Sequence, residues 1–198
     1  MKELMIATSN AHKVDEFKKM LEPRGIVVKS LLDLDEQFEI EENGTTFEEN
    51  ALIKARSIAR HLNMAVISDD SGLVIDALNG EPGIHSARYL GHDTDYMTKN
   101  TIILNRLADV EGNDRSARFV CAIALVYPDG REMTFTGTFE GFIHDRIEGP
   151  NGFGYDPIFY YPPFGTTSAN VSDEMKNAVS HRGNALKLLM EYLDHEEA

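Results

Sequence analysis

The order of the first segments is the feature that most limits how this chain can fold. Residues 4–7 form a short apolar run typical of a buried strand, and residues 26–28 form a second one. Between them, residues 10–21 place apolar side chains at helical spacing, and Pro23 and Gly25 end that helix. A strand, a helix and a strand in this order predict a parallel unit, because two parallel strands need a crossover connection.

The later segments continue to alternate between strands and helices. Thr46 and Glu49 form a capping box that begins the best-defined helix, over residues 46–62. The other expected segments are strands over 65–68, 73–75, 118–127, 132–139 and 142–143, loops over 79–91 and 148–156, a hairpin turn at 128–130, a helix capped by Thr94 that reaches about 107, and a helical region from Ser172 to about 193. We predict an α/β fold, with a mixed β-sheet flanked by helices, in a single domain over 1–198 that includes a hairpin-rich lobe over about 116–145.

The chain is strongly acidic, which limits its partners. Its formal net charge is -14, from 33 acidic and 19 basic residues. Polymeric nucleic acid is therefore not an expected partner, because that binding depends on lysine and arginine at the phosphates, and an anionic membrane would repel the chain. A small anionic substrate fits if a few basic groups converge or a cation bridges the charges.

Neither a membrane segment nor a disulfide is expected. No apolar run approaches the roughly 20 residues that cross a bilayer. Cys121 is the only cysteine, so no intrachain disulfide can form. These features predict a cytoplasmic protein, since a reducing compartment suits such a chain.

The polar turn Thr8-Ser9-Asn10-Ala11-His12-Lys13 lies between the first strand and its helix. Small polar side chains and a lysine at a helix N-terminus can form a cradle for phosphate. The alternative is a plain capped turn, in which Asn10 caps the helix and Lys13 lies in solvent.

Two acidic segments could hold a cation. Asp69 and Asp70 follow a buried strand, where adjacent carboxylates repel each other and point in opposite directions. One of them can bind Mg²⁺ or accept a proton from water while the other is structural; the alternative is a surface turn. Lys54 could face Asp70, but nothing in the sequence orients it. The stretch Glu39, Glu41 and Glu42 offers oxygen ligands for Mg²⁺, or is a solvated acidic run.

Two later segments suit a nucleotide. The loop Gly152-Phe153-Gly154-Tyr155-Asp156-Pro157 can form a platform for a flat base, with a carboxylate for a ring N–H or a ribose hydroxyl. The alternative is a turn with a buried aromatic residue. Lys176 and the segment Ser180-His181-Arg182 add cationic groups that could hold phosphate or read a purine carbonyl, or form a solvated helix face.

Six motifs together resemble the inosine triphosphate pyrophosphatase family, over residues 1 to about 193. Each motif alone is weak, but six in the family's order and spacing are highly specific. They are Thr8-Ser9-Asn10-Ala11-His12-Lys13, Glu41-Glu42-Asn43-Gly44-Thr45-Thr46-Phe47-Glu48-Glu49-Asn50-Ala51, Ser68-Asp69-Asp70-Ser71-Gly72-Leu73, Pro82-Gly83-Ile84-His85-Ser86-Ala87-Arg88-Tyr89, Gly152-Phe153-Gly154-Tyr155-Asp156-Pro157 and Ser180-His181-Arg182-Gly183.

The resemblance implies a fold and a reaction. The fold would be an elongated mixed β-sheet with two lobes and a central nucleotide-binding cleft, in a homodimer. The reaction would be Mg²⁺-dependent hydrolysis of non-standard purine nucleoside triphosphates (ITP, dITP and XTP) to the monophosphate and pyrophosphate, which cleanses the nucleotide pool.

The resemblance also implies a role for particular residues. Asp70 would activate the attacking water and bind the metal, with Glu41 as the second metal carboxylate. Lys13 and Lys176 would stabilise charge on the phosphoryl oxygens, and Arg182 or His181 would donate to the C6 carbonyl of the base. The substrate contacts would be Thr8, Ser9, Asn10, Ala11, His12, Lys13, Ser71, Phe153, Gly154, Tyr155, Asp156, Lys176, His181 and Arg182.

Two other functions compete with this interpretation. The septum-formation-inhibitor-like pyrophosphatases have a similar architecture, but they carry Ser and Arg where this chain has Asn10 and Lys13 and they lack the Ser-His-Arg segment. A non-catalytic purine-binding module would need a nucleotide cleft but would not need Glu41 together with Asp70. Pyrophosphate release from a panel of triphosphates separates the three.

Overall fold

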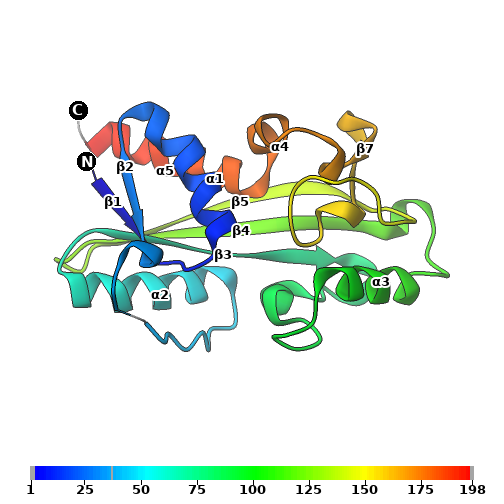
Figure 1. Ribbon diagram of the computed structural model, residues 1–198, viewed down its shortest axis with the longest axis horizontal. Coiled ribbons are helices and arrows are strands. Elements are labelled where there is room, and N and C mark those ends of the chain that lie inside the picture. The colour runs from blue at the N-terminus through cyan, green and yellow to red at the C-terminus, as the bar shows by residue number, and fades with distance from the viewer. Residues whose placement is uncertain (1–2, 37, 197–198) are drawn as a thin grey trace. The chain divides into compact units, whose positions relative to one another are not determined.

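A mixed β-sheet with helices beside it organises the chain (Figure 1). The computed structural model describes residues 3–36 and 38–196. The strands are β1 (Glu3–Ile6), β2 (Val27–Ser30), β3 (Val66–Ile75), β4 (Ser116–Val126), β5 (Glu132–Ile143), β6 (Phe159–Tyr161) and β7 (Thr166–Thr167), and their order in the sheet is β2-β1-β3-β4-β5-β6-β7. The α-helices are α1 (Ala11–Leu21), α2 (Phe47–Leu62), α3 (Tyr96–Arg106), α4 (Asp173–Val179) and α5 (His181–Glu196). The predicted α/β class is confirmed.

The parallel unit predicted at the start of the chain is present. Strand β1 pairs in parallel with β2, where Leu4 lies opposite Val28, and with β3, where Met5 lies opposite Val66. Helix α1 is the crossover from β1 to β2, and it ends before a short 3-10 turn closed by Gly25, whose φ is +79°. Glycine suits that left-handed position because it has no Cβ.

Two strands are longer than the sequence predicted. Strand β3 runs without a break through Asp69, Asp70, Ser71 and Gly72, where two short strands were expected. Strand β5 likewise continues to Ile143. Pairing with neighbouring strands overrides the low strand propensity of aspartate and glycine, which is weaker than tertiary context. The acidic pair therefore lies inside a strand.

Helix starts also differ from the prediction in detail. Helix α3 is capped by Asp95, whose carboxylate accepts the backbone N–H of Thr98 at 2.9 Å, so the assignment of that cap to Thr94 was wrong. The Thr94 hydroxyl instead donates to the Leu90 carbonyl at 2.7 Å. Thr46 caps α2 as predicted, but the Glu49 carboxylate reaches back to the N–H of Thr45.

The chain divides into two compact units. Unit 1 comprises the described residues of Met1–Asp70, Cys121–Gly137 and Arg182–Ala198, and unit 2 comprises Ser71–Val120 and Thr138–His181. Strands β3, β4 and β5 each pass from one unit into the other, so the β4–β5 hairpin is shared between them. The single domain predicted from the sequence stays a prediction.

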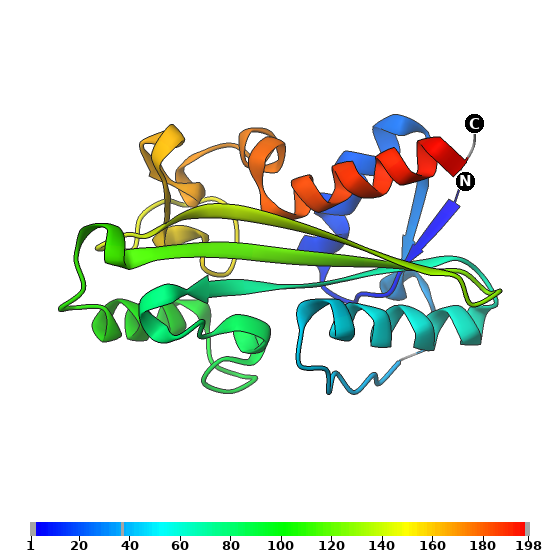
Figure 2. The ribbon, with the colours of Figure 1, turned by 180° about the vertical axis from the view of Figure 1, so that it is seen from behind.

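Unit 1 has an apolar core on each face of its strands. Alternate residues of β1 serve the two faces, because successive side chains of a strand point to opposite sides. Leu4 and Ile6 join a cluster with α1 and α5, and Met5 and Ala7 join a second cluster with α2. Figures 1 and 2 show α1 and α5 together on one side of these strands and α2 on the other.

Unit 2 is built around aromatic side chains. The Phe119 and Phe159 ring centroids are 4.6 Å apart, and those of Phe139 and Phe159 are 4.9 Å apart. Tyr155, in the glycine-rich loop, and Ile158, just after that loop, are buried in the same cluster. Strand β6 pairs antiparallel with β5, and β7 with β6. Within residues 3–36 and 38–196, no helix combines the length and the apolar character that crossing a membrane requires.

Adjacent leucines of α5 test the unit 1 core. Leu189 is fully buried and Leu188 is 43% exposed. We expect Leu189→Ala to lower the free energy of unfolding by about 2–5 kcal/mol, because it leaves a cavity between α5 and the sheet. The matched variant Leu188→Ala should change it by less than about 0.5 kcal/mol. Urea unfolding followed by circular dichroism measures both, and equal effects would show that α5 does not pack as described.

Candidate functional site

The turn between β1 and α1 is a capped helix start. The Asn10 side-chain oxygen accepts the backbone N–H groups of His12 at 3.0 Å and Lys13 at 3.3 Å. The Thr8 hydroxyl oxygen accepts the N–H of Asn10 at 3.2 Å. Ser9, Ala11 and His12 are exposed at this N-terminus, where the helix dipole favours an anion. The capping alternative therefore holds for Asn10, and the turn still offers a surface to phosphate.

Lys13 does not lie in solvent, as the capping alternative assumed. Its ammonium nitrogen is 3.0 Å from Oδ2 of Asp69, and its side chain is 15% exposed. Arg182 donates to the same Asp69 oxygen at 3.1 Å and also pairs with Glu16 on α1. Asp69 thus joins the turn of residues 8–13 to the start of α5.

Asp69 stays ionised although it is buried. Burial by itself would raise the pKa of Asp69, but the positive charges of Lys13 and Arg182 outweigh it and hold that pKa well below its usual range. The neighbouring Cys121 sulfur lies 3.9 Å from Asp69 Oδ2, and burial together with that carboxylate raises the pKa of Cys121 to about 12. At neutral pH Cys121 is therefore a neutral thiol, while Asp69 carries a negative charge in the core.

Asp70 meets different partners from those of Asp69. Lys54 of α2 places its ammonium nitrogen 3.6 Å from Asp70 Oδ1 and 3.3 Å from Oε2 of Glu42. The other oxygen, Asp70 Oδ2, is buried and has no hydrogen-bond partner among the described residues. Burial raises the pKa of Asp70, and Lys54 only partly offsets this. The two carboxylates thus have separate environments, as strand alternation predicted.

Asp70, Glu41 and Glu42 are the candidate ligands for Mg²⁺. Among the described residues, no three His, Cys, Asp or Glu side chains cluster closely enough to hold a metal ion by themselves. Magnesium usually takes one or two carboxylates and completes its shell with water and substrate phosphates. The orphaned oxygen of Asp70 suits that arrangement. Glu41 is exposed and has no ion pair with the described residues, whereas Glu42 is already paired with Lys54.

The glycine-rich loop of unit 2 is organised by Asp156. This buried carboxylate accepts the Phe153 backbone N–H at 2.9 Å, the Lys176 ammonium at 2.7 Å and the Ser168 hydroxyl at 2.7 Å. A Cβ at Gly152 would lie 2.3 Å from Asp156 Oδ2, so only glycine fits there. Both Asp156 oxygens are engaged within the protein, and its direct contact with a base stays a prediction.

The cationic side chain of Lys176 lies close to the aromatic ring of the loop. The Lys176 ammonium nitrogen is 5.0 Å from the centre of the half-buried Phe153 ring. The His181 ring stacks on Phe119, with centroids 4.9 Å apart and an angle of 18° between the planes. Lys176, His181 and Ser71, which follows Asp70 in β3, belong to unit 2, as does the loop of residues 152–156. Arg182 instead shares Asp69 with Lys13 in unit 1.

Several residues of these networks were not identified from the sequence. Glu16 lies three positions after Lys13 on α1, a spacing that places both on one helix face. The contact between Lys54 and Asp70, which the sequence allowed but did not fix, joins α2 to β3. The pairing of Glu42 with Lys54, which joins a loop to α2, was not predicted. No local sequence signal fixes contacts of that kind.

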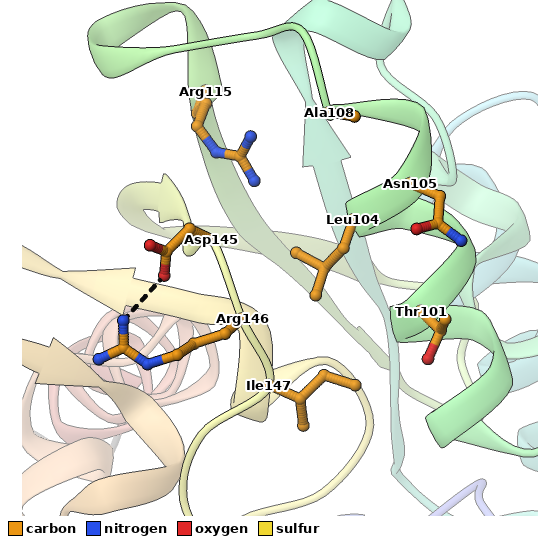
Figure 3. Close-up of a pocket in the computed structure, with 8 residues that line it drawn as sticks. All are labelled: Thr101, Leu104, Asn105, Ala108, Arg115, Asp145, Arg146 and Ile147. Carbon is orange, nitrogen blue, oxygen red and sulfur yellow. Dashed lines mark hydrogen bonds and ion pairs between the residues drawn. The ribbon is translucent and has the colours of Figure 1, made fainter.

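A pocket of about 500 Å³ in unit 2 contains none of the predicted site residues. Figure 3 shows its lining: Thr101, Leu104, Asn105, Ala108, Arg115, Asp145, Arg146 and Ile147. The Arg115 guanidinium is already occupied, because it donates to the carbonyls of Leu107, Val110, Ile143 and His144. Arg115 thus fastens the end of α3 to the end of β5, and Asp145 pairs with Arg146.

Comparisons with known proteins cover nearly the whole chain. The sequence profile of the Ham1 family matches residues 4–192. The dITP/XTP pyrophosphatases of Bacillus licheniformis and Halalkalibacterium halodurans are each 50% identical over 98% of this chain, and the match covers 99% and 100% of those proteins. The solved structure of the Staphylococcus aureus Ham1 protein has a TM-score of 0.88 at 45% identity, covering 98% of this chain and 100% of that one. A HAM1 protein from Coxiella burnetii has a TM-score of 0.88 at 39% identity, with the same shares covered.

The buried Asp69 ion pairs predict a pH-dependent stability. The pKa of Asp69 is lower in the folded chain than in the unfolded one, so its stabilising effect is complete above about pH 4 and is lost as the pH falls further. At pH 7, Asp69→Asn should lower the free energy of unfolding by about 3–5 kcal/mol, because Lys13 and Arg182 lose the carboxylate that they share. The difference from wild type should shrink towards pH 3. Urea unfolding in EDTA measures this.

The exposed pair of Asp15 and Lys19 on α1 supplies the control for that experiment. Asp15→Asn should change the free energy of unfolding by no more than about 0.5 kcal/mol at pH 7. A difference between wild type and Asp69→Asn that does not depend on pH would contradict the ion-pair network.

Proposed function

This chain belongs to the Ham1 family, and from that premise we propose that it is a nucleoside triphosphate pyrophosphatase that depends on Mg²⁺. It hydrolyses non-standard purine nucleoside triphosphates, among them ITP, dITP and XTP, to the nucleoside monophosphate and pyrophosphate. This reaction cleanses the nucleotide pool. The family inferred from the six sequence motifs is confirmed, and the relatives named dITP/XTP pyrophosphatase support the substrate class.

The environment of the Asp70 carboxylate is the observation that supports the proposal most strongly. Its Oδ2 atom is buried without a hydrogen-bond partner among the described residues, and burial raises its pKa. A carboxylate with a raised pKa is a better general base near neutral pH than an ordinary one. Asp70 accepts a proton from a water molecule, whose oxygen attacks the α-phosphorus. The bond from that phosphorus to the bridging oxygen breaks, and pyrophosphate leaves with the bridging oxygen.

Unit 1 supplies the positive charge for the triphosphate. The turn Thr8-Ser9-Asn10-Ala11-His12-Lys13 presents a helix N-terminus to the phosphate oxygens, and Lys13 is held beside it by Asp69. Lys54 lies next to Asp70 and can stabilise charge on the attacked phosphoryl group. Lys176 is paired with Asp156 in unit 2, so we assign it to the base, instead of to the phosphoryl oxygens as expected from the sequence.

Asp70 and Glu41 would hold the Mg²⁺. When bound, the ion supplies charge neutralisation and polarisation at the phosphate oxygens. The Asp70 oxygen without a hydrogen-bond partner and the exposed Glu41 carboxylate support this assignment, whereas Glu42 serves as the partner of Lys54.

Unit 2 supplies base recognition. Phe153 offers a half-buried ring on which a purine can stack, with Gly154 and Tyr155 completing the loop. His181 stacks on Phe119 near the start of α5, and it is the donor that we assign to the C6 carbonyl of hypoxanthine or xanthine. Adenine has an amine at that position and would leave the donor without an acceptor. The Arg182 guanidinium is engaged with Asp69, so we assign the donor role to His181 and not to Arg182.

Two further features extend the proposal. The protein forms a homodimer, as the family resemblance implies, and it acts in the cytoplasm. The single cysteine, which excludes an intrachain disulfide, supports a reducing compartment.

A pyrophosphate-release assay tests the activity. We expect release from XTP, dITP and ITP in the presence of Mg²⁺, little release from ATP, and none from any of them in EDTA. Preference for a pyrimidine triphosphate would favour the septum-formation-inhibitor-like function. Binding of purine triphosphates without release would favour a non-catalytic module.

Asp70→Asn is the control variant of that assay. It should lower kcat by about 10²–10⁴-fold, because it removes the general base, while the variant still binds the triphosphate. Full activity of this variant would refute the assignment of Asp70.

The neighbouring glutamates distinguish the two candidate metal ligands. Glu41→Gln should raise the Mg²⁺ concentration for half-maximal activity by at least about tenfold, because it removes a carboxylate ligand. Glu42→Gln is the matched variant and should shift it less, since that carboxylate is paired with Lys54. Titrating activity against Mg²⁺ measures both. The reverse order of effects would assign the metal to Glu42.

A further inference from the structure

Three segments of unit 2 are tied to one another in a closed ring of hydrogen bonds. They are helix α3, the 3-10 turn Gly83–Arg88 and the base loop, which we define as residues 152–156. Asn100 on α3 donates its side-chain N–H to the Gly154 carbonyl at 3.1 Å. Lys99 donates to the Ala87 carbonyl at 2.7 Å, and the Tyr155 hydroxyl donates to the Ser86 carbonyl at 2.6 Å. Each segment therefore contacts the other two.

Asn100 has an unusual place in this ring. It is 2% exposed, and on its side of α3 it precedes the buried apolar residues Ile103 and Leu107. The Oδ1 atom of Asn100 is buried and has no hydrogen-bond partner among the described residues. Exchanging the two ends of the amide would turn this oxygen towards the Gly154 carbonyl, so the donor must face the loop. A buried amide with one unsatisfied atom costs stability that an apolar residue would not.

The hydrogen bond from Asn100 completes the fixation of Phe153. Gly152 and Gly154, on either side of Phe153, have φ angles of +73° and +67°, which side chains with a Cβ rarely adopt. Asp156 holds the N–H of Phe153, and Asn100 holds the carbonyl of the next residue. The Tyr96 ring of α3 also packs edge-on against Tyr155, with centroids 5.2 Å apart. Without these contacts the two glycines would let the loop adopt other conformations.

We propose that Asn100 is a positioning residue for base recognition, because it fixes the base loop so that the Phe153 ring is ready to stack on a purine. This inference rests on the proposed function. Asn100 acts through Gly154, which belongs to the base loop and not to the residues assigned to the phosphates or the cation. Its loss should therefore weaken the interaction with the base and leave the interaction with pyrophosphate unchanged.

Inhibition by a purine monophosphate and inhibition by pyrophosphate separate those two interactions. The variants are Asn100→Ala and the matched Asn105→Ala, which lies on the same helix but is exposed. Each is assayed for XTP hydrolysis with Mg²⁺, with IMP or pyrophosphate as the inhibitor. In Asn100→Ala we expect the KM for XTP and the inhibition constant of IMP to rise about tenfold, the factor that loss of one hydrogen bond gives. The inhibition constant of pyrophosphate and kcat should stay within about twofold, and Asn105→Ala should match wild type.

Each other outcome has a defined meaning. If wild type releases no pyrophosphate from XTP, the proposed function fails first. Two results with an active wild type would show that the positioning role is wrong. One is that the inhibition constants of Asn100→Ala match those of wild type. The other is that the inhibition constants of IMP and pyrophosphate rise by the same factor. Asn100→Asp is the second variant, because it keeps the shape and loses the donor. Failure of both variants to reach the wild-type circular dichroism would make Asn100 a folding residue and would overturn the proposal.

Discussion

The ion pairs of Asp69 hold helices α1 and α5 of unit 1 together. A carboxylate that is 1% exposed would be costly in the core if it stood alone, and Lys13 and Arg182 make it favourable. These partners come from α1 and α5, which are far apart in the sequence and lie on the same side of the strands (Figure 1). The turn of residues 8–13 is therefore held in place by a buried negative charge.

Strand alternation explains how two adjacent aspartates acquire opposite tasks. Asp69 faces α1 and α5, where two cations keep it ionised, and Asp70 faces α2, where burial raises its pKa. A similar division exists in unit 2, where Asp156 organises the base loop and leaves the Phe153 ring accessible. In both units a buried carboxylate pairs with a lysine and holds its surroundings in place.

The sequence predicted the parts whose signals are local. The parallel unit, the cap at Thr46 and the separate environments of Asp69 and Asp70 follow from spacing and from strand geometry. The prediction of a break within β3 was wrong, because pairing with neighbouring strands outweighs the low strand propensity of residues 69–72. The pairing of Arg182 with Asp69 could not be predicted, because it joins residues 113 positions apart. The same holds for Asn100 and Gly154, whose contact depends on how α3 packs against the loop.

The continuity of β3 has a consequence for how this chain can evolve. Its register is fixed where Met5 and Ile6 of β1 lie opposite Val66 and Ile67, only two residues before Asp69. Insertion or deletion of one residue between Ile67 and Asp69 would rotate both carboxylates to the wrong faces of the sheet. A deletion would place Asp70 opposite Lys13 and Arg182 and would put Ser71 in the place of Asp70. An insertion would put Asp69 in the place of Asp70 and would leave Lys13 and Arg182 without that carboxylate. Substitutions can sample this strand one side chain at a time, but a change in its length alters the surroundings of both carboxylates in a single event.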